Sequence, residues 1–207
     1  MKKTILKFNN QLSPLQQLLW LGFIVRLLAV FFSKGFGWHD DHFLIIEPAQ
    51  SWVDGFDYNA WMPSTEHPER TAQGHPLLYT GFHYYLFLLL KYIGLQNPQG
   101  KMLVVRFLHA LWSLLIIKYG YLIAKHYGNN KSAWYTGLFL ALFWFMPFIS
   151  VRNLAEFVSV PPMLIGMYLL IKKDKKTRDL LLAGLWLGLG ISMRFQLAFV
   201  LVGLALG

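Results

Sequence analysis

Long apolar runs dominate this chain and limit what it can fold into. A helix needs about 20 consecutive apolar residues to cross the hydrocarbon core of a bilayer, and several runs approach that length. Hydrophobic residues make up 56% of the 207 positions, so the pattern predicts a membrane protein and argues against a soluble globular one. Six apolar segments can be marked: residues 15–33, 77–95, 102–124, 133–150, 154–171 and 180–207.

The basic residues predict which ends of these segments face the cytoplasm, because short cytoplasmic loops carry an excess of Lys and Arg. Three basic clusters lie in residues 2–7, 125–131 and 172–178. If all six segments crossed, the first and last clusters would fall on opposite sides. If residues 77–95 do not cross, all three become cytoplasmic. We therefore expect an all-α polytopic bundle of about five transmembrane helices, with residues 77–95 lying as an interfacial helix.

This topology predicts one long external loop, residues 34–101, as the catalytic part of a membrane module covering residues 1–207. Seven of the ten acidic residues lie in this loop, and the remaining connections are short. The apolar N-terminal run lacks a small-x-small cleavage site, which indicates a retained anchor instead of a signal peptide. The sequence stops inside an apolar run, so we expect it to be the N-terminal part of a longer protein.

Charge and cysteine content exclude several other classes. The net charge of +9 lies at the ends of apolar runs, where membrane topology explains it, so no nucleic-acid partner is expected. The chain has no cysteine, which excludes disulfides and thiolate chemistry.

Ionisable residues crowd the loop directly after the first apolar segment. His39, Asp40, Asp41 and His42 are consecutive, and Glu47 follows. Carboxylates at the hydrocarbon boundary are costly to desolvate, and they persist mainly where they face a polar cavity or serve a reaction. One of them could act as general base on an acceptor hydroxyl, whereas the simpler alternative is a solvated loop edge. Consecutive residues cannot all face one ion, so no metal is expected.

Two later positions bring further charge to the same predicted face. Arg152 and Glu156 are spaced i and i+4, so a helix beginning there would place them on one face, with Asn153 able to cap it. A local salt bridge explains this motif without catalysis. Arg194 lies about 21 Å along its segment from the cytoplasmic edge, within reach of a lipid phosphate or of a buried structural partner.

These motifs, in this order, resemble the C-type integral membrane glycosyltransferases. His39-Asp40-Asp41-His42-Phe43, with Glu47 downstream, is similar to the short acidic sequence after the first span in that superfamily. Arg152-Asn153-Leu154-Ala155-Glu156 loosely resembles its Arg, Asn and Glu motif, and residues 105–111 and 124–128 are similar to its next span and turn. The closest resemblance is to mannosyltransferases that use polyprenyl-phosphate mannose.

The resemblance implies a function, a location and a set of site residues. It implies transfer of a hexose, most simply mannose, from a polyprenyl-phosphate-linked donor to a hydroxyl of a lipid-linked or exported glycan acceptor at the outer face of a bacterial plasma membrane, among membrane lipids and without a cofactor. It implies catalytic roles for Asp40, Asp41 and Glu156, with Asp40 or Asp41 as the base. The substrate-binding residues would be His39, His42, Glu47, Arg70, Arg152, Asn153 and Arg194.

Two other functions remain open at this point. A transporter or flippase of lipid-linked sugars would carry acidic groups at mid-bilayer and an inverted repeat, and this sequence shows neither. A non-catalytic membrane assembly subunit would use the acidic loop as an interaction surface.

Overall fold

The described part of the chain, residues 12–35, 39–61 and 77–206 of a computed structural model, is helical and contains no strand. The all-α prediction is therefore confirmed. The elements are α2 (Pro14–Phe32), α3 (His39–Asp41), the π-helix η1 (His42–Ile46), α4 (Glu47–Asp54), α5 (Leu77–Tyr92), α6 (Pro98–Tyr127), α7 (Asn130–Leu142), α8 (Met146–Ile149), α9 (Ala155–Val158), α10 (Val160–Ile171), α11 (Thr177–Met193) and α12 (Leu197–Leu206).

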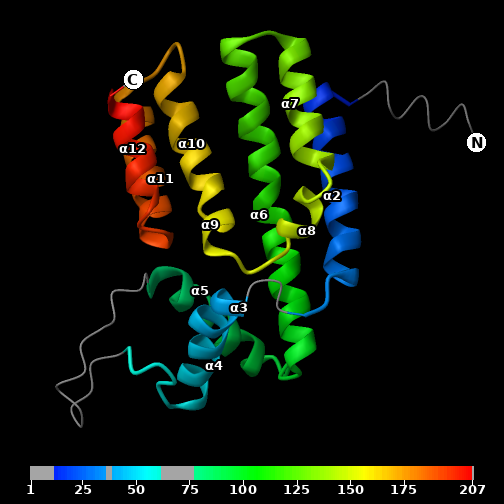
Figure 1. Cartoon of the computed structure of the whole chain (residues 1–207), viewed down its shortest axis with the longest axis vertical. Helices are drawn as coiled ribbons and strands as arrows, with labels where there is room; N and C mark the ends of the chain where they lie inside the picture. Colours follow the sequence, from blue (N-terminus) through cyan, green and yellow to red (C-terminus); the bar gives the residue numbers. More distant parts are fainter. Residues whose placement is uncertain (1–11, 36–38, 62–76, 207) are drawn as a thin grey trace, which may run out of the picture.

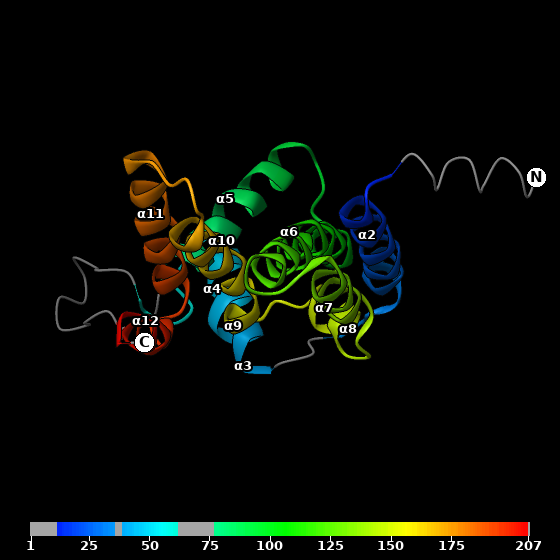
Figure 2. The ribbon, with the colours of Figure 1, turned by 90° about the horizontal axis from the view of Figure 1, so that it is seen from above.

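The helices form two groups. In Figure 1, α2, α6, α7, α10, α11 and α12 run side by side in the long direction of the molecule. Helices α3, α4 and α5 gather at the lower end of this group, and α5 is inclined across it in both views (Figures 1 and 2). The candidate site lies where the two groups meet.

Two helices are long and apolar enough to cross a membrane, α2 with 19 residues and α6 with 30 residues. At 1.5 Å per residue, α6 is about 45 Å long, so it exceeds the hydrocarbon core of roughly 30 Å. Residues Ala155–Ile171 form a shorter apolar helical stretch. Helix α6 therefore connects the two ends of the molecule and passes the site on its way.

Local sequence signals set the ends of the long helices. Ser13 caps α2 because its side-chain oxygen accepts a hydrogen bond from the backbone N–H of Gln16, and the Gln16 side-chain Oε1 accepts one from the Ser13 backbone N–H. Asn97 caps α6 and is followed by Pro98 in the first helical turn. Asn129 caps α7. These are the residue types that satisfy the free N–H groups of a first turn.

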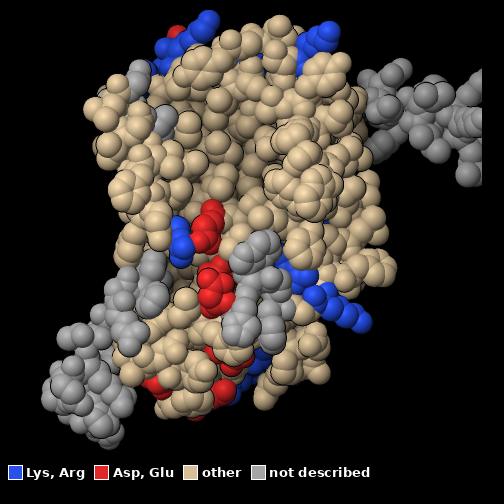
Figure 3. Space-filling view, in the orientation of Figure 1, with Lys and Arg blue, Asp and Glu red and all other residues tan. Residues whose placement is uncertain are grey.

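Basic side chains gather at the end opposite α3, α4 and α5. The α6–α7 and α10–α11 turns lie at the upper end in Figure 1, and Figure 3 shows Lys and Arg there. Acidic side chains appear mainly in the middle and lower parts of the same face, with further basic side chains beside them. The basic turns and the acidic loop expected from the sequence therefore lie at different heights of the molecule.

A buried arginine joins α2 to α6 and α7. Arg26 has no exposed surface, and it donates hydrogen bonds to Ser113 Oγ at 2.9 Å and to the carbonyl oxygens of Leu140 and Ala141 at 3.1 and 3.3 Å. The two carbonyls lie at the end of α7, where the next turn would otherwise bond to them. Arg26 thus faces protein, as an arginine at membrane depth is expected to do.

The last apolar segment, expected as one unit from residue 180 to 207, is divided in two. Helix α11 ends at Met193, α12 begins at Leu197, and Arg194 between them has an extended backbone with φ −149° and ψ 109°. The expectation of an unbroken segment was wrong. The break could not be seen from composition, because the residues on both sides of it are apolar. At the break, Arg194 forms an ion pair with Glu156.

Candidate functional site

The two adjacent aspartates face different surroundings. Asp41 is only 5% exposed, whereas Asp40 is exposed to solvent. Both lie in α3, and the π-helix η1 follows directly. Single π-helical turns are rare and often occur at functional sites. The two aspartates could not be told apart in the sequence. In the structure Asp41 is the inner carboxylate and Asp40 the outer one.

The segment before and at the start of α9 holds the inner carboxylate in place. The backbone N–H of Ala155 donates to Asp41 Oδ2 at 3.2 Å, and Asn153 Nδ2 donates to the Asp41 carbonyl oxygen at 3.1 Å. Asn153 was expected to cap a helix, but the N-cap position is Leu154, and the Asn153 amide bonds to Asp41 instead. One short segment thus fixes both the backbone and the side chain of Asp41.

The surroundings of Asp41 favour its protonated form. Burial is the largest cause, and the nearby charges of Glu156 and Asp40 add to it, so that the pKa of Asp41 is raised from 3.8 to about 6. The hydrogen bond from Ala155 and the charge of Arg194 act in the opposite direction. A carboxylate with a pKa near neutral pH is suited to accepting a proton during a reaction.

Glu156 pairs with a partner that the sequence did not predict. The expected bridge between Arg152 and Glu156 does not form; Arg194 bonds to Glu156 Oε1. The i, i+4 argument failed because α9 begins at Ala155, which leaves Arg152 outside the helix. Arg194 is thereby brought to the small cavity that Asp41 also lines.

Arg152 and Arg106 instead hold the chain that leads from α2 to Asp40 and Asp41. Arg152 donates to the carbonyl oxygens of Gly35 at 2.6 Å and Lys34 at 3.1 Å, and Arg106 donates to the carbonyl oxygen of Ser33. These carbonyls follow the end of α2, where backbone acceptors lack intrahelical partners. The two arginines therefore fix the exit of α2.

The remaining predicted site residues are spread around this centre. His42 Nε2 lies 3.0 Å from Glu47 Oε1, a contact within the external loop. Pro48 lies in the first turn of α4, where proline is tolerated. His39 is the first residue of α3. Arg70 lies outside the described residues.

Two neighbouring cavities meet at this centre. The small one has a volume of about 30 Å³, and its lining includes Asp41, Thr80 and Arg194. Among the described residues, neither Thr80 Oγ1 nor Arg194 Nε finds a hydrogen-bond partner, although both atoms are buried. Buried polar atoms are normally paired, so these two are free to bind a polar group that enters the cavity.

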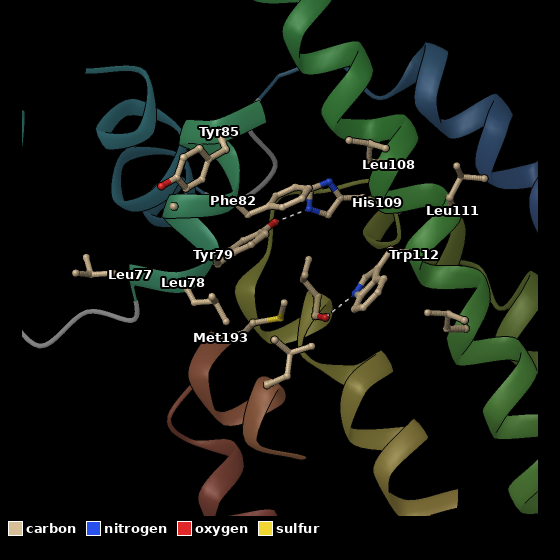
Figure 4. A pocket seen from close by; sticks show the side chains of 14 residues that line it. Leu77, Leu78, Tyr79, Phe82, Tyr85, Leu108, His109, Leu111, Trp112 and Met193 are labelled. Carbon is tan, nitrogen blue, oxygen red and sulfur yellow. Dashed lines mark hydrogen bonds between the residues drawn. The ribbon is translucent and has the colours of Figure 1, made fainter. Parts of the chain in front are cut away.

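The large cavity is apolar and has a volume of about 1010 Å³ (Figure 4). Helices α5 and α6 supply most of its wall, and Val158, Leu189 and Met193 add to it from α9 and α11. Tyr79 and Met193 line both cavities. An apolar space of this size therefore adjoins the polar centre at Asp41.

Sequence reasoning missed two buried polar residues behind Asp41, Tyr79 and His109, which lie together with the predicted site residue Asn153. The Tyr79 hydroxyl contacts His109 Nε2 and donates to Asn153 Oδ1 at 2.7 Å, and all three residues are buried. The available signal was a histidine within the apolar segment 102–124, which the sequence analysis did not use. Packing alone would also explain such a histidine.

Metal ligation is not visible in the described residues. No group of three or more His, Cys, Asp or Glu side chains within residues 12–35, 39–61 and 77–206 is arranged to hold an ion. His42 and Glu47 pair with each other.

The family model of the dolichyl-phosphate-mannose-protein mannosyltransferases matches residues 83–206. The chain belongs to this family. Its members are glycosyltransferases of the membrane that use polyprenyl-phosphate mannose as donor, which agrees with the resemblance seen in the sequence. The matched region includes Arg152, Asn153, Glu156 and Arg194, whereas Asp40 and Asp41 precede it. No curated protein and no solved structure matches the chain.

Proposed function

We propose that this protein transfers mannose from a polyprenyl-phosphate-linked donor to a hydroxyl of a lipid-linked or exported acceptor, with Asp41 as the base. One observation carries the proposal. The buried carboxylate of Asp41 and the guanidinium of Arg194 line one small cavity, which shares Tyr79 and Met193 with a large apolar cavity. A mannosyl phosphate on a long apolar chain requires this combination of surfaces.

The large cavity suits the polyprenyl chain. Its volume of about 1010 Å³ is at the upper end of pockets that enclose a drug-sized ligand, roughly 300 to 1,000 Å³. Leu78, Phe82 and Leu111 supply part of its apolar wall, so it stabilises hydrocarbon by removing it from the headgroup region. The chain would enter here and leave its phosphate beside Arg194.

The proposed reaction uses the polar centre as follows. Asp41, ionised, accepts the proton of the acceptor hydroxyl as the oxygen forms a bond to the anomeric carbon of mannose. The bond between that carbon and the phosphate oxygen breaks on the opposite side, which inverts the configuration, and the electron pair leaves with the polyprenyl phosphate. Arg194 carries positive charge to the departing phosphate, a role that suits a guanidinium.

Asp40 and Glu156 have supporting roles in this proposal. Asp40 is exposed and lies on the outer side of α3, where it can meet the acceptor. Glu156 orients Arg194 through their ion pair and raises the proton affinity of Asp41. Arg152 holds the loop in place through the carbonyls of Lys34 and Gly35.

We also infer how the chain lies in the membrane. Helices α2, α6, α7, the α9–α10 stretch and α11 would cross, α12 would return, and α5 would lie at the outer interface. The basic α6–α7 and α10–α11 turns lie at one end and the acidic centre nearer the other (Figures 1 and 3), which supports a cytoplasmic and an external end. A bacterial plasma membrane fits this topology. Labelling of cysteines introduced at residues 40 and 174 from each side of sealed vesicles tests it.

The function is tested by following transfer of labelled mannose from polyprenyl-phosphate mannose by the full chain in native membranes. Asp41→Asn should lower kcat by about 10²- to 10⁴-fold, the range for losing a general base. Asp174→Asn is the matched control, because Asp174 is exposed in the basic turn between α10 and α11. Wild-type turnover in Asp41→Asn would refute the assignment of the base.

A further inference from the structure

A series of hydrogen bonds connects the wall of the apolar cavity to Asp41. His109 Nδ1 lies 2.7 Å from the carbonyl oxygen of Val105, and His109 Nε2 contacts the Tyr79 hydroxyl (Figure 4). That hydroxyl donates to Asn153 Oδ1 at 2.7 Å, and Asn153 Nδ2 donates to the Asp41 carbonyl oxygen at 3.1 Å. Four elements of the fold, α6, α5, the turn before α9 and α3, are joined by one chain of contacts.

Burial makes these hydrogen bonds consequential. Tyr79 is 3% exposed, His109 6% and Asn153 7%. A buried polar group that loses its hydrogen-bond partner is left with the cost of its desolvation. The three side chains therefore fix one another's positions. Asn153 in turn fixes the backbone of Asp41 through its hydrogen bond to the Asp41 carbonyl oxygen.

The Tyr79 hydroxyl connects His109 on one side of this series of contacts to Asn153 on the other. The contact of His109 Nδ1 with a carbonyl oxygen places a hydrogen on Nδ1, so a neutral ring offers Nε2 as an acceptor. The Tyr79 hydroxyl has one hydrogen, which it donates to Asn153 Oδ1, and His109 Nε2 is the alternative acceptor in contact with the same oxygen. Removal of this one oxygen disconnects both.

Tyr79 also stands at the boundary between the two cavities. It lines the large apolar cavity together with His109, and it lines the small cavity together with Asp41 and Arg194. A ligand that fills the apolar cavity therefore contacts the same side chain that bonds to Asn153, which in turn bonds to the Asp41 backbone. No other hydroxyl group lines both cavities among the described residues.

We propose that Tyr79 and His109 are positioning residues that hold Asp41 in its reactive orientation through Asn153 and couple this orientation to occupancy of the apolar cavity. The role of Asp41 as base rests on the proposed function; the mechanical connection to Asp41 does not. Neither Tyr79 nor His109 needs to touch the reacting atoms. Their effect reaches the reaction through the placement of Asp41 and of the Ala155 N–H that binds its carboxylate.

Tyr79→Phe tests the proposal, because it removes the hydroxyl and keeps the ring. Tyr121→Phe is the matched control, since Tyr121 is also a buried tyrosine but packs against Leu18 and Ile117 in the core of α2, α6 and α7. Both variants are compared with wild type as the full chain in lipid nanodiscs. Amide hydrogen exchange at Ala155 is measured with and without undecaprenyl phosphate, and mannosyl transfer is measured in parallel.

We expect amide exchange at Ala155 to be about tenfold faster in Tyr79→Phe and unchanged in Tyr121→Phe. Undecaprenyl phosphate should slow this exchange in wild type but not in Tyr79→Phe. In the transfer assay, kcat should fall about 10- to 100-fold, the scale of a small misplacement of a catalytic group, while KM for the donor stays within about twofold.

Any other result would contradict either the positioning role of Tyr79 or the proposed mannosyl transfer. Wild-type exchange and kcat in Tyr79→Phe would overturn the positioning role, and so would a rise in KM at constant kcat, which indicates direct donor binding. Faster exchange without mannosyl transfer by wild type would leave the positioning role standing and reject the function. His109→Gln, which keeps a polar group near the hydroxyl, should lie between wild type and Tyr79→Phe.

Discussion

The backbone N–H of Ala155 donates a hydrogen bond to the carboxylate of Asp41 at 3.2 Å, although the two residues lie 114 positions apart in the chain. The bond brings the external loop after α2 onto the start of α9. The bond also occupies Oδ2 of Asp41. The other carboxylate oxygen, Oδ1, is left for the small cavity that Arg194 also lines.

The pH dependence of transfer should reflect the ionisation of Asp41. The base must be ionised, and the pKa of Asp41 is raised to about 6, so kcat/KM should be constant above about pH 7 and fall tenfold per unit below pH 6. Glu156→Gln removes a negative charge that raises this pKa, so the acidic limb should move to lower pH. A pH–rate profile for wild type and Glu156→Gln checks both statements. A limb that stays in place would show that Asp41 does not govern it.

Asp41→Asn should stabilise the folded protein at neutral pH. Because the pKa of Asp41 is raised from 3.8 in the unfolded chain to about 6 in the fold, the folded state disfavours the ionised form. This penalty is absent below about pH 4 and grows until about pH 6. Asparagine carries no charge, and its side-chain oxygen can still accept the hydrogen bond from the Ala155 N–H. The free energy of unfolding at pH 8 should rise by roughly 3 kcal/mol, measured by thermal or denaturant unfolding in detergent, with no difference at pH 4.

Loss of Arg26 should weaken the packing of α2 against α6 and α7. Arg26→Met removes donors to Ser113 Oγ and to the Leu140 and Ala141 carbonyl oxygens. Leaving such buried acceptors unpaired costs about 3 kcal/mol in total. The thermal midpoint of the purified protein should drop, and Arg26→Lys should recover part of the loss. Lys125→Met, at an exposed position of α6, serves as control; an equal drop there would contradict the packing argument.

The contact between α10 and α11 should depend on Gly166. A Cβ at Gly166 would meet Leu187 Cγ at 2.6 Å and the Ala183 carbonyl oxygen at 3.1 Å, whereas one at Gly184 would meet nothing within 4 Å. Gly166→Val should therefore lower the free energy of unfolding by about 1 to 3 kcal/mol. Gly184→Val introduces the same side chain into open space and should have little effect. The two variants are compared by thermal unfolding in one detergent.

Much of the helical architecture could be predicted from the sequence. The apolar segment 15–33 corresponds to α2 (Pro14–Phe32) and 102–124 to α6 (Pro98–Tyr127), because helix-length apolar runs and capping residues are local signals. The break at Arg194 was missed, since its flanks are as apolar as a continuous span. The bridge between Arg152 and Glu156 was wrong for a related reason: the i, i+4 rule applies only inside a helix, and α9 starts after Arg152.

The sequence by itself determined the membrane class, the helical fold and the gathering of carboxylates in the loop after the first apolar segment, because each depends on neighbouring residues or on composition. Only the tertiary structure decided that Asp41 is buried while Asp40 is exposed, that Arg194 pairs with Glu156, and that Tyr79 lines both the apolar cavity and the small cavity at Asp41. These relationships join residues far apart in the chain, and their burial and pairing exist only once the helices pack. Local pattern carries no information on which distant side chains will share a desolvated space.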